Sequence, residues 1–213
     1  MKTINTTILL IIIASFALGF YFYSQMPDFM ASHWNMRGEV NGYMSKFWGL
    51  FLMPLLALAM WLLFLLIPKI DPLKHNIQKF REYFDNFIAL IILFLFYIYV
   101  LTLVWNLGYR FDLTQMMLPA FAILFYYSGV LISKTKQNWF IGIRTPWTLS
   151  SENVWKKTHK LGSKLFKACA LISLLGLFFV NFAFWLVIIP VILSSVYVFI
   201  FSYLEHKKEQ NGK

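Results

Sequence analysis

The sequence predicts an all-α integral membrane protein with six transmembrane helices, N and C termini in the cytoplasm, and an amphipathic surface helix between helices 4 and 5. Three observations support this fold class. Of 213 residues, 60% are hydrophobic and only 13% are charged, whereas soluble domains average about 25% charged residues. Six apolar runs have roughly the length of a membrane span. Basic residues concentrate in alternate connecting segments.

Each apolar run is assigned one crossing, because a spanning helix needs about 20 apolar residues to cross a hydrocarbon core of about 30 Å. The last two runs are nearly continuous, but together they hold about 40 residues, which fits two crossings. We place the turn between them at Asn181, the amide that separates them. The runs lie at residues 8–23, 47–67, 87–105, 116–132, 165–180 and 182–203.

The distribution of Lys and Arg sets the expected orientation. With the N-terminus inside, 16 of the 19 basic residues fall in cytoplasmic segments and 3 in outer segments, as the positive-inside rule requires. The net charge of +10 is therefore explained by topology, with the lipid bilayer as a partner and no direct nucleic-acid binding. The localisation expected is a bacterial cell membrane, crossed several times.

The cytoplasmic segment before the fifth run carries specific chemistry. Gly142 permits a backbone angle closed to other residues, and Thr145 precedes Pro146 and is pushed toward extended geometry. We expect a fixed, extended turn here rather than a helix. Ser150 then suits the N-cap of a helix that begins at Ser151.

That helix is predicted to be basic and amphipathic. Val154, Thr158, Leu161 and Leu165 fall on one stripe, with Trp155 and His159 on its flank and five lysines opposite. A helix of this kind lies on the inner leaflet as a simple connector, whereas a loop with so many defined side chains suits recognition. Both interpretations stay open. The residues expected to bind a ligand or partner are Asn138, Trp139, Gly142, Arg144, Thr145, Pro146, Trp147, Trp155 and His159.

The first outer loop, residues 26–49, is the second polar segment with a defined character. Pro27-Asp28 and Asn41-Gly42 are turn signals, and we expect an ordered cap held against the outer leaflet by aromatic side chains. His33, Asp28 and Glu39 could be drawn as a metal site, but their spacing fits no ligand pattern. The functional residues proposed in this loop are His33, Trp34, Asn35, Gly38, Glu39 and Gly42.

Neither an enzyme nor an ion-coupled transporter is expected. The chain has no nucleophile-elbow, zinc-protease or phosphate-loop motif, and its four His residues lie in different loops. No apolar run contains an interior Asp, Glu, Arg or His, although coupled transporters normally need such groups. We therefore expect no catalytic residue, no metal and no cofactor, while a passive pore or carrier stays open.

Two segments resemble a known family. "NWFIGIRTPWTLSSENVWKKTHKLGSKLF", residues 138–166, resembles the signature loop of the SdpI family of bacterial toxin-immunity membrane proteins. "MPDFMASHWNMRGEVNGYMSKFWG", residues 26–49, is similar to the extracytoplasmic domain often fused before it. On this resemblance we divide the chain into residues 1–67, a two-helix hairpin with an ordered outer loop; 68–110, the third helix and a cytoplasmic linker; and 111–213, an SdpI-like domain of three helices.

The resemblance implies a function. A member of this family protects the cell from a secreted, membrane-active peptide toxin and, as a toxin receptor, holds a transcriptional repressor at the membrane. The expected partners are thus the bilayer, a secreted peptide toxin and a cytoplasmic transcriptional repressor. The alternatives are a passive transporter or channel-like protein, and a structural membrane protein without a ligand.

Overall fold

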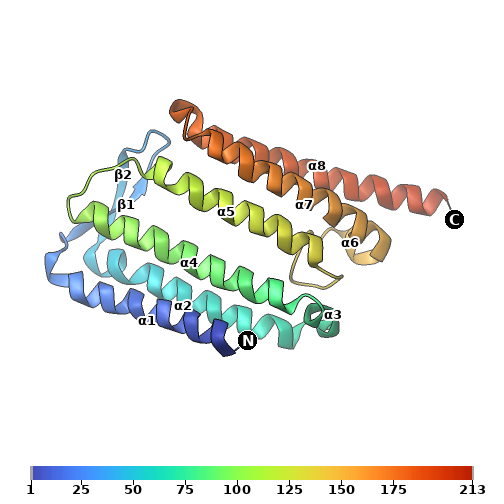
Figure 1. Ribbon diagram of the computed structural model, residues 1–213, viewed down its shortest axis with the longest axis horizontal. Coiled ribbons are helices and arrows are strands. Elements are labelled where there is room, and N and C mark those ends of the chain that lie inside the picture. Colours follow the sequence, from blue (N-terminus) through green and yellow to red (C-terminus); the bar gives the residue numbers. More distant parts are fainter. Residues whose placement is uncertain (1, 213) are drawn as a thin grey trace.

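The computed structural model describes residues 2–212 as six long helices that run side by side, with a β-hairpin at the end opposite both termini (Figure 1). The long helices are α1 (Lys2–Phe22), α2 (Lys46–Ile70), α4 (Arg81–Asn106), α5 (Leu113–Lys134), α7 (Glu152–Leu175) and α8 (Ala183–Asn211). The short elements are η1 (Tyr23–Gln25), β1 (Phe29–Trp34), β2 (Val40–Ser45), α3 (Lys74–Gln78), α6 (Pro146–Ser150) and η2 (Val180–Phe182).

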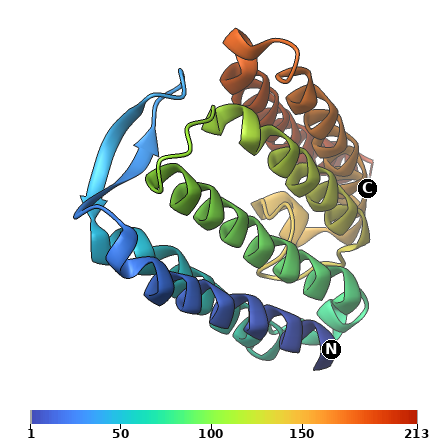
Figure 2. The same cartoon turned by 60° about the vertical axis from the view of Figure 1, so that its left-hand side comes forward.

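The long helices form two groups of three. α1, α2 and α4 pack on one another, α5, α7 and α8 do the same, and α4 against α5 joins the groups (Figure 2). A large buried cluster in the first group includes Ile8 and Ile12 of α1 and Ile88 and Ile92 of α4. Ile141, from the loop after α5, also belongs to this cluster, so the first group of helices helps to position that loop.

Five of the described helices are long and apolar enough to cross a membrane, and the chain is a multi-pass membrane protein. They correspond to α1, α2, α4, α5 and α8. α7 is also long, but its residues up to Lys167 include five lysines, which are expensive in hydrocarbon. The six-span prediction is therefore confirmed only for five helices.

The sequence predicted a surface helix followed by a separate fifth span, but the structure has one helix, α7, in their place. It is one continuous helix from Glu152 to Leu175, packed against both α5 and α8. The stripe predicted to face lipid instead faces protein at Val154 and Thr158, which are buried, as are the flanking Trp155 and His159. The prediction of a turn at Asn181 is confirmed, since η2 at Val180–Phe182 separates α7 from α8.

The outer loop contains β-structure, which the all-α prediction missed. β1 and β2 pair antiparallel, with register shifts on either side of His33. Their turn lies at Asn35–Glu39, so the prediction of a turn at Asn41-Gly42 was wrong: Gly42 lies within β2, opposite His33. A Cβ on Gly42 would lie 2.9 Å from the His33 Cβ, so Gly42 is needed for close strand pairing rather than for the turn.

Candidate functional site

The loop after α5 is shaped by the fully buried amide of Asn138. Its Oδ1 accepts the Phe140 and Ile141 N–H groups, and its Nδ2 donates to the carbonyls of Lys136 and Ile141, all within 2.6–2.9 Å. One side chain thus replaces the backbone partners that a turn would otherwise lack. The predicted site residue Asn138 has a folding role.

Side chains of the α2–α4 linker hold this loop from the other side. Asp71 is buried and accepts the Trp139 N–H at 2.9 Å and the Leu73 N–H at 2.6 Å. Asn76 of α3 donates to the Gln137 carbonyl at 2.8 Å. Sequence reasoning missed Asp71 and Asn76 because they lie more than 60 residues away from their partners in the chain.

Gly142, Trp155 and His159 form one packed unit. Gly142 has a φ of 114°, and a Cβ there would lie 2.5 Å from His159 Nε2. The His159 ring stacks on Trp155 with centroids 3.9 Å apart, and Trp155 Nε1 donates to the Thr135 carbonyl at 3.2 Å. Only glycine can adopt this positive φ and also leave room for the His159 ring. The unusual backbone angle was predicted from the sequence.

The hydrogen bonds of His159 define its protonation state. Nε2 accepts the Ile143 N–H at 3.0 Å, so the proton lies on Nδ1, which donates to the Trp155 carbonyl at 2.8 Å. Burial lowers the pKa of His159 to about 4, and the bond to the Trp155 carbonyl opposes this shift. His159 is therefore neutral at physiological pH, with both nitrogens occupied, and is unsuited to binding a metal.

The second half of the predicted extended turn is helical. Thr145 is extended, as predicted, but it caps α6, which begins at Pro146. Thr145 and Thr148 form a reciprocal capping box, and proline is favoured at the first helical position. The predicted N-cap at Ser150 was off by one residue, because Ser151 caps α7 and accepts the Val154 N–H at 3.2 Å.

α6 is docked onto α8 by a polar and an aromatic contact. The buried Thr145 hydroxyl lies 3.0 Å from that of Ser202, which donates to the Phe199 carbonyl at 2.7 Å. The Trp147 ring lies 5.1 Å from the rings of both Phe199 and Tyr203. Thr145 and Trp147 therefore fasten the signature loop to the last helix.

Arg144 and Trp139 lie at the surface of the same loop. Trp139 is 51% exposed, and the exposed Arg144 donates from Nη1 to the Trp139 carbonyl at 2.6 Å. No carboxylate lies within ion-pair distance of Arg144 in the described part of the chain. These two side chains, together with the exposed Pro146, are members of the predicted set that remain available to a partner.

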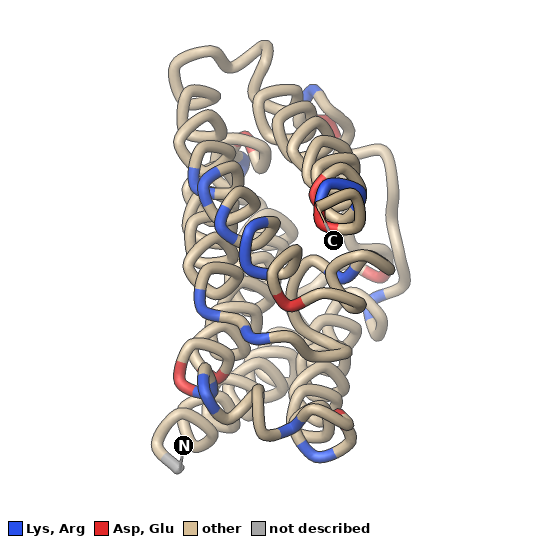
Figure 3. Tube along the Cα trace, turned by 90° about the vertical axis from the view of Figure 1, so that its right-hand side faces the viewer, with Lys and Arg blue, Asp and Glu red and all other residues tan. Residues whose placement is uncertain are grey.

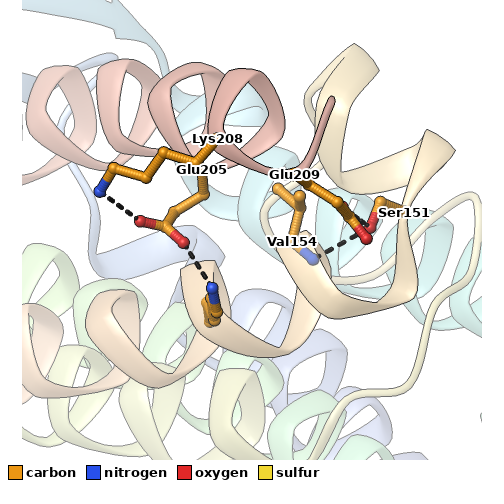
Figure 4. Close-up of polar contacts among 6 residues, drawn as sticks. Ser151, Val154, Glu205, Lys208 and Glu209 are labelled. Carbon is orange, nitrogen blue, oxygen red and sulfur yellow. Dashed lines mark hydrogen bonds and ion pairs between the residues drawn. The ribbon is translucent and has the colours of Figure 1, made fainter. Parts of the chain in front are cut away.

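Ionic contacts join the start of α7 to the end of α8 (Figure 4). The buried Glu205 carboxylate bonds Lys157 Nζ at 2.7 Å and Lys208 Nζ at 2.9 Å. The Ser151 hydroxyl, which accepts the Val154 N–H, donates to Glu209 at 2.6 Å. Glu205 and Glu209 were not predicted, because a charge pair between distant helices leaves no local sequence pattern.

The predicted outer residues come together in the β-hairpin. Asn35 Oδ1 accepts the Arg37 and Glu39 N–H groups, its Nδ2 donates to the Glu39 carboxylate at 2.8 Å, and Gly38 has a φ of 74°. His33 Nδ1 lies 2.5 Å from Asn41 Oδ1. Asp28 pairs instead with Lys46, so His33, Asp28 and Glu39 do not converge.

The hairpin is attached to α4 by Trp34 and by a residue that was not predicted. Asn106 of α4 accepts the Ala31 N–H at 2.8 Å and donates to the Ala31 carbonyl at 3.1 Å, as a neighbouring strand would. Trp34 packs edge-on against Trp105 with centroids 5.6 Å apart. Trp34 is thus held by the protein and not by the outer leaflet, the place predicted for the aromatic side chains of this loop.

A cavity of about 620 Å³ lies beneath the hairpin, among the outer ends of α2, α4, α5 and α8. Its lining is mainly apolar; the polar members are Ser32, His33, Trp34, Asn35, Asn41, Thr102 and Thr114. The Trp34 Nε1–H is buried and has no acceptor among residues 2–212. The cavity has the size and character of a ligand site and offers an unused hydrogen-bond donor in its wall.

The predicted residues thus form two sets at opposite ends of the helices. The signature-loop set lies at the end that carries both termini, where Figure 3 shows a run of Lys and Arg positions. The hairpin set lies at the other end (Figure 1). A single ligand cannot touch both sets, so any communication between them must pass along the helices.

Comparisons with known proteins cover both sets. Residues 134–203 match the SdpI/YfhL protein family, and residues 10–58 match a family described as a domain of unknown function (DUF1648). The chain is 27% identical over 205 residues to "Immunity protein SdpI" of Bacillus subtilis (strain 168), an alignment that covers 96% of each protein. No solved structure matches the chain. The predicted family resemblance is confirmed.

Proposed function

Because residues 134–203 belong to the SdpI/YfhL protein family, we propose that the chain is an integral membrane immunity protein that protects its cell from a secreted, membrane-active peptide toxin. One observation carries the proposal: the similarity to the Bacillus subtilis immunity protein extends over 96% of both chains. It therefore includes the outer hairpin as well as the signature loop.

The proposed topology has six crossings with both termini in the cytoplasm, α7 being the fifth. The charge distribution supports this orientation, because 16 of 19 basic residues then lie inside. The lysines of α7 lie between Lys156 and Lys167, toward the end that carries both termini, while residues from Ala168 to Leu175 carry no charge. Only about the last third of α7 then lies in hydrocarbon, and the uncharged residues up to Phe182 continue this apolar part.

We place toxin recognition at the outer cavity beneath the hairpin. A peptide that attacks the membrane from outside meets this end first, and the apolar walls of the cavity suit the apolar face of such a peptide. Protection is binding without a chemical step: we propose no catalysis and no cofactor.

The test is survival of a sensitive bacterium that expresses the chain, challenged with a panel of secreted membrane-active peptides. The proposal expects survival to rise above that of cells with an empty vector for at least one peptide. Equal killing across the panel, with the protein verified in the membrane, would contradict it.

A signalling role is the finer part of the proposal. The exposed lysines at the start of α7, such as Lys156, Lys157 and Lys160, suit an acidic surface on a cytoplasmic transcriptional repressor. Lys157 is already paired with Glu205, so charge reversal at Lys156 and Lys160 is the cleaner test. A fluorescent repressor of the producing organism should leave the membrane in Lys156→Glu/Lys160→Glu cells; unchanged localisation would contradict this role.

A further inference from the structure

A basic cavity of about 460 Å³ lies between the end of α5 and the first half of α7, away from the outer cavity. It combines five lysines with three hydroxyl groups. The lysines are Lys136, Lys156, Lys160, Lys164 and Lys167, and the hydroxyl residues are Ser133, Thr135 and Ser163.

The positive charge of this cavity is largely uncompensated. Lys156 pairs with Glu152 at 2.9 Å, and both side chains are mostly exposed. Within residues 2–212, Lys136, Lys160, Lys164 and Lys167 have no carboxylate at ion-pair distance. Four cations gathered around one hollow give it a positive potential, which favours an anion there.

Ser163 adds an independent sign of a ligand. It is only 5% exposed and lines the cavity, yet it makes no hydrogen bond within the described chain. Ser133 and Thr135 donate to the carbonyls of Val130 and Ile132. The Ser163 Oγ is not among the side-chain atoms closed off from solvent without a partner, so the hydroxyl is open to the cavity and can donate to an anionic oxygen held by the surrounding lysines.

The cavity continues into apolar surface on the membrane side. Lys160, Lys164, Lys167 and Leu171 follow one face of α7 at spacings of three and four residues. Lys167 Nζ lies 5.6 Å from the centre of the Tyr126 ring. Leu171 is 67% exposed and Tyr126 is 53% exposed, so a stripe that begins basic ends as bare apolar surface.

We propose that this cavity binds the phosphate headgroup of an anionic phospholipid, with its acyl chains along Leu171 and Tyr126. Lys160, Lys164 and Ser163 contact the phosphate oxygens. The ligand comes from the leaflet at the end that carries both termini. The proposal does not depend on the immunity function, because it rests on the charge, the unpartnered hydroxyl and the adjoining apolar stripe.

The test is lipid binding to the purified full-length protein in detergent, followed by native mass spectrometry and thermal unfolding. The probes are phosphatidylglycerol, phosphatidylcholine with matched acyl chains, and inorganic phosphate alone. The variants are Lys160→Gln/Lys164→Gln and, separately, Ser163→Ala. The control is Lys74→Gln/Lys207→Gln, which removes two exposed lysines outside the cavity.

Phosphatidylglycerol should bind more tightly than phosphatidylcholine and raise the unfolding temperature. The Lys160→Gln/Lys164→Gln variant should bind it about thirtyfold more weakly, because it removes two lysines and each lysine near an anionic lipid contributes about 1 kcal/mol. The control should bind as the unmodified protein does, and Ser163→Ala should show a smaller loss. Equal binding of the two lipids, or an unchanged Lys160→Gln/Lys164→Gln variant, would overturn the proposal. Stabilisation by inorganic phosphate equal to that by phosphatidylglycerol would overturn the lipid as its source.

Discussion

At the scale of single residues, the signature loop is held by side chains that replace missing backbone partners. Asn138 closes its own turn, Asp71 reaches the loop from another element, and His159 accepts the Ile143 N–H. Each of these groups is buried, so losing one partner leaves the other without a hydrogen bond, at a cost of about 1–3 kcal/mol. Most of the residues predicted to bind a partner are needed first to build the loop.

Gly142→Ala should destabilise the protein more than Gly108→Ala. Both glycines have a positive φ, but a Cβ at Gly142 meets His159 and Trp155, whereas nothing lies within 4 Å of one at Gly108. Backbone strain costs about 1–3 kcal/mol at either position, so the difference reports the lost packing. Thermal unfolding in detergent measures both variants, and equal shifts would contradict the described contact.

Acidification should weaken the fold through His159. Its folded pKa of about 4 lies below its ordinary value of 6.5, so between these values the unfolded chain binds a proton that the folded chain does not. The contribution of His159 to the free energy of unfolding is therefore fully present above pH 6.5 and is lost as the pH decreases toward 4. At pH 5 the loss is about 2 kcal/mol.

The measurement is the free energy of unfolding at pH 7.5 and pH 5 for the unmodified protein and for His159→Gln, which retains a donor and an acceptor. Between pH 7.5 and pH 5, the free energy of unfolding of His159→Gln should fall by about 2 kcal/mol less than that of the unmodified protein. An identical loss in both proteins would show that His159 is not the titrating group.

At the scale of elements, α6 is the part of the loop that fastens the bundle. Its capping box begins the helix, and Thr145 and Trp147 then attach it to α8. The Glu205 and Ser151 contacts join α7 to the same helix. The end of α8 is therefore held by two successive elements of the signature loop.

Trp147→Ala should therefore destabilise the protein by about 2–4 kcal/mol, because it removes a large aromatic contact from α8. Trp139→Ala is the matched control, since half of that side chain is already exposed, and it should cost much less. Chemical unfolding followed by helical circular dichroism measures both. A larger loss of stability in Trp139→Ala than in Trp147→Ala would contradict the role of Trp147 in attaching α6 to α8.

The elements were predictable to the extent that their signals are local. The apolar runs predicted the positions of the long helices. The glycine at position 142 and the residue before proline at Thr145 predicted the backbone angles at those two positions. α7 was divided wrongly, because its lysines suggested a surface helix while α5 and α8 cover its other side. The β-hairpin was missed because Asn106 and Trp105, which hold it to α4, are about 70 residues away in the sequence.

At the scale of the whole molecule, the proposed orientation puts the hairpin outside and both termini inside. Single cysteines at Arg37→Cys, in the hairpin turn, and Lys207→Cys, near the end of α8, test this in a Cys169→Ala background. A membrane-impermeant maleimide should label Arg37→Cys in intact cells and Lys207→Cys only after permeabilisation. The reverse pattern would overturn the orientation.

The most direct test of the account is whether filling the outer cavity abolishes protection. Thr102 and Thr114 line this cavity, so Thr102→Trp and Thr114→Trp should each occupy space that the toxin needs. Ala17→Trp, on the exposed face of α1, adds the same side chain elsewhere. At equal amounts of protein in the membrane, toxin-challenged cells with either cavity variant should die like vector controls, while Ala17→Trp cells should survive. Full protection by both cavity variants would contradict it.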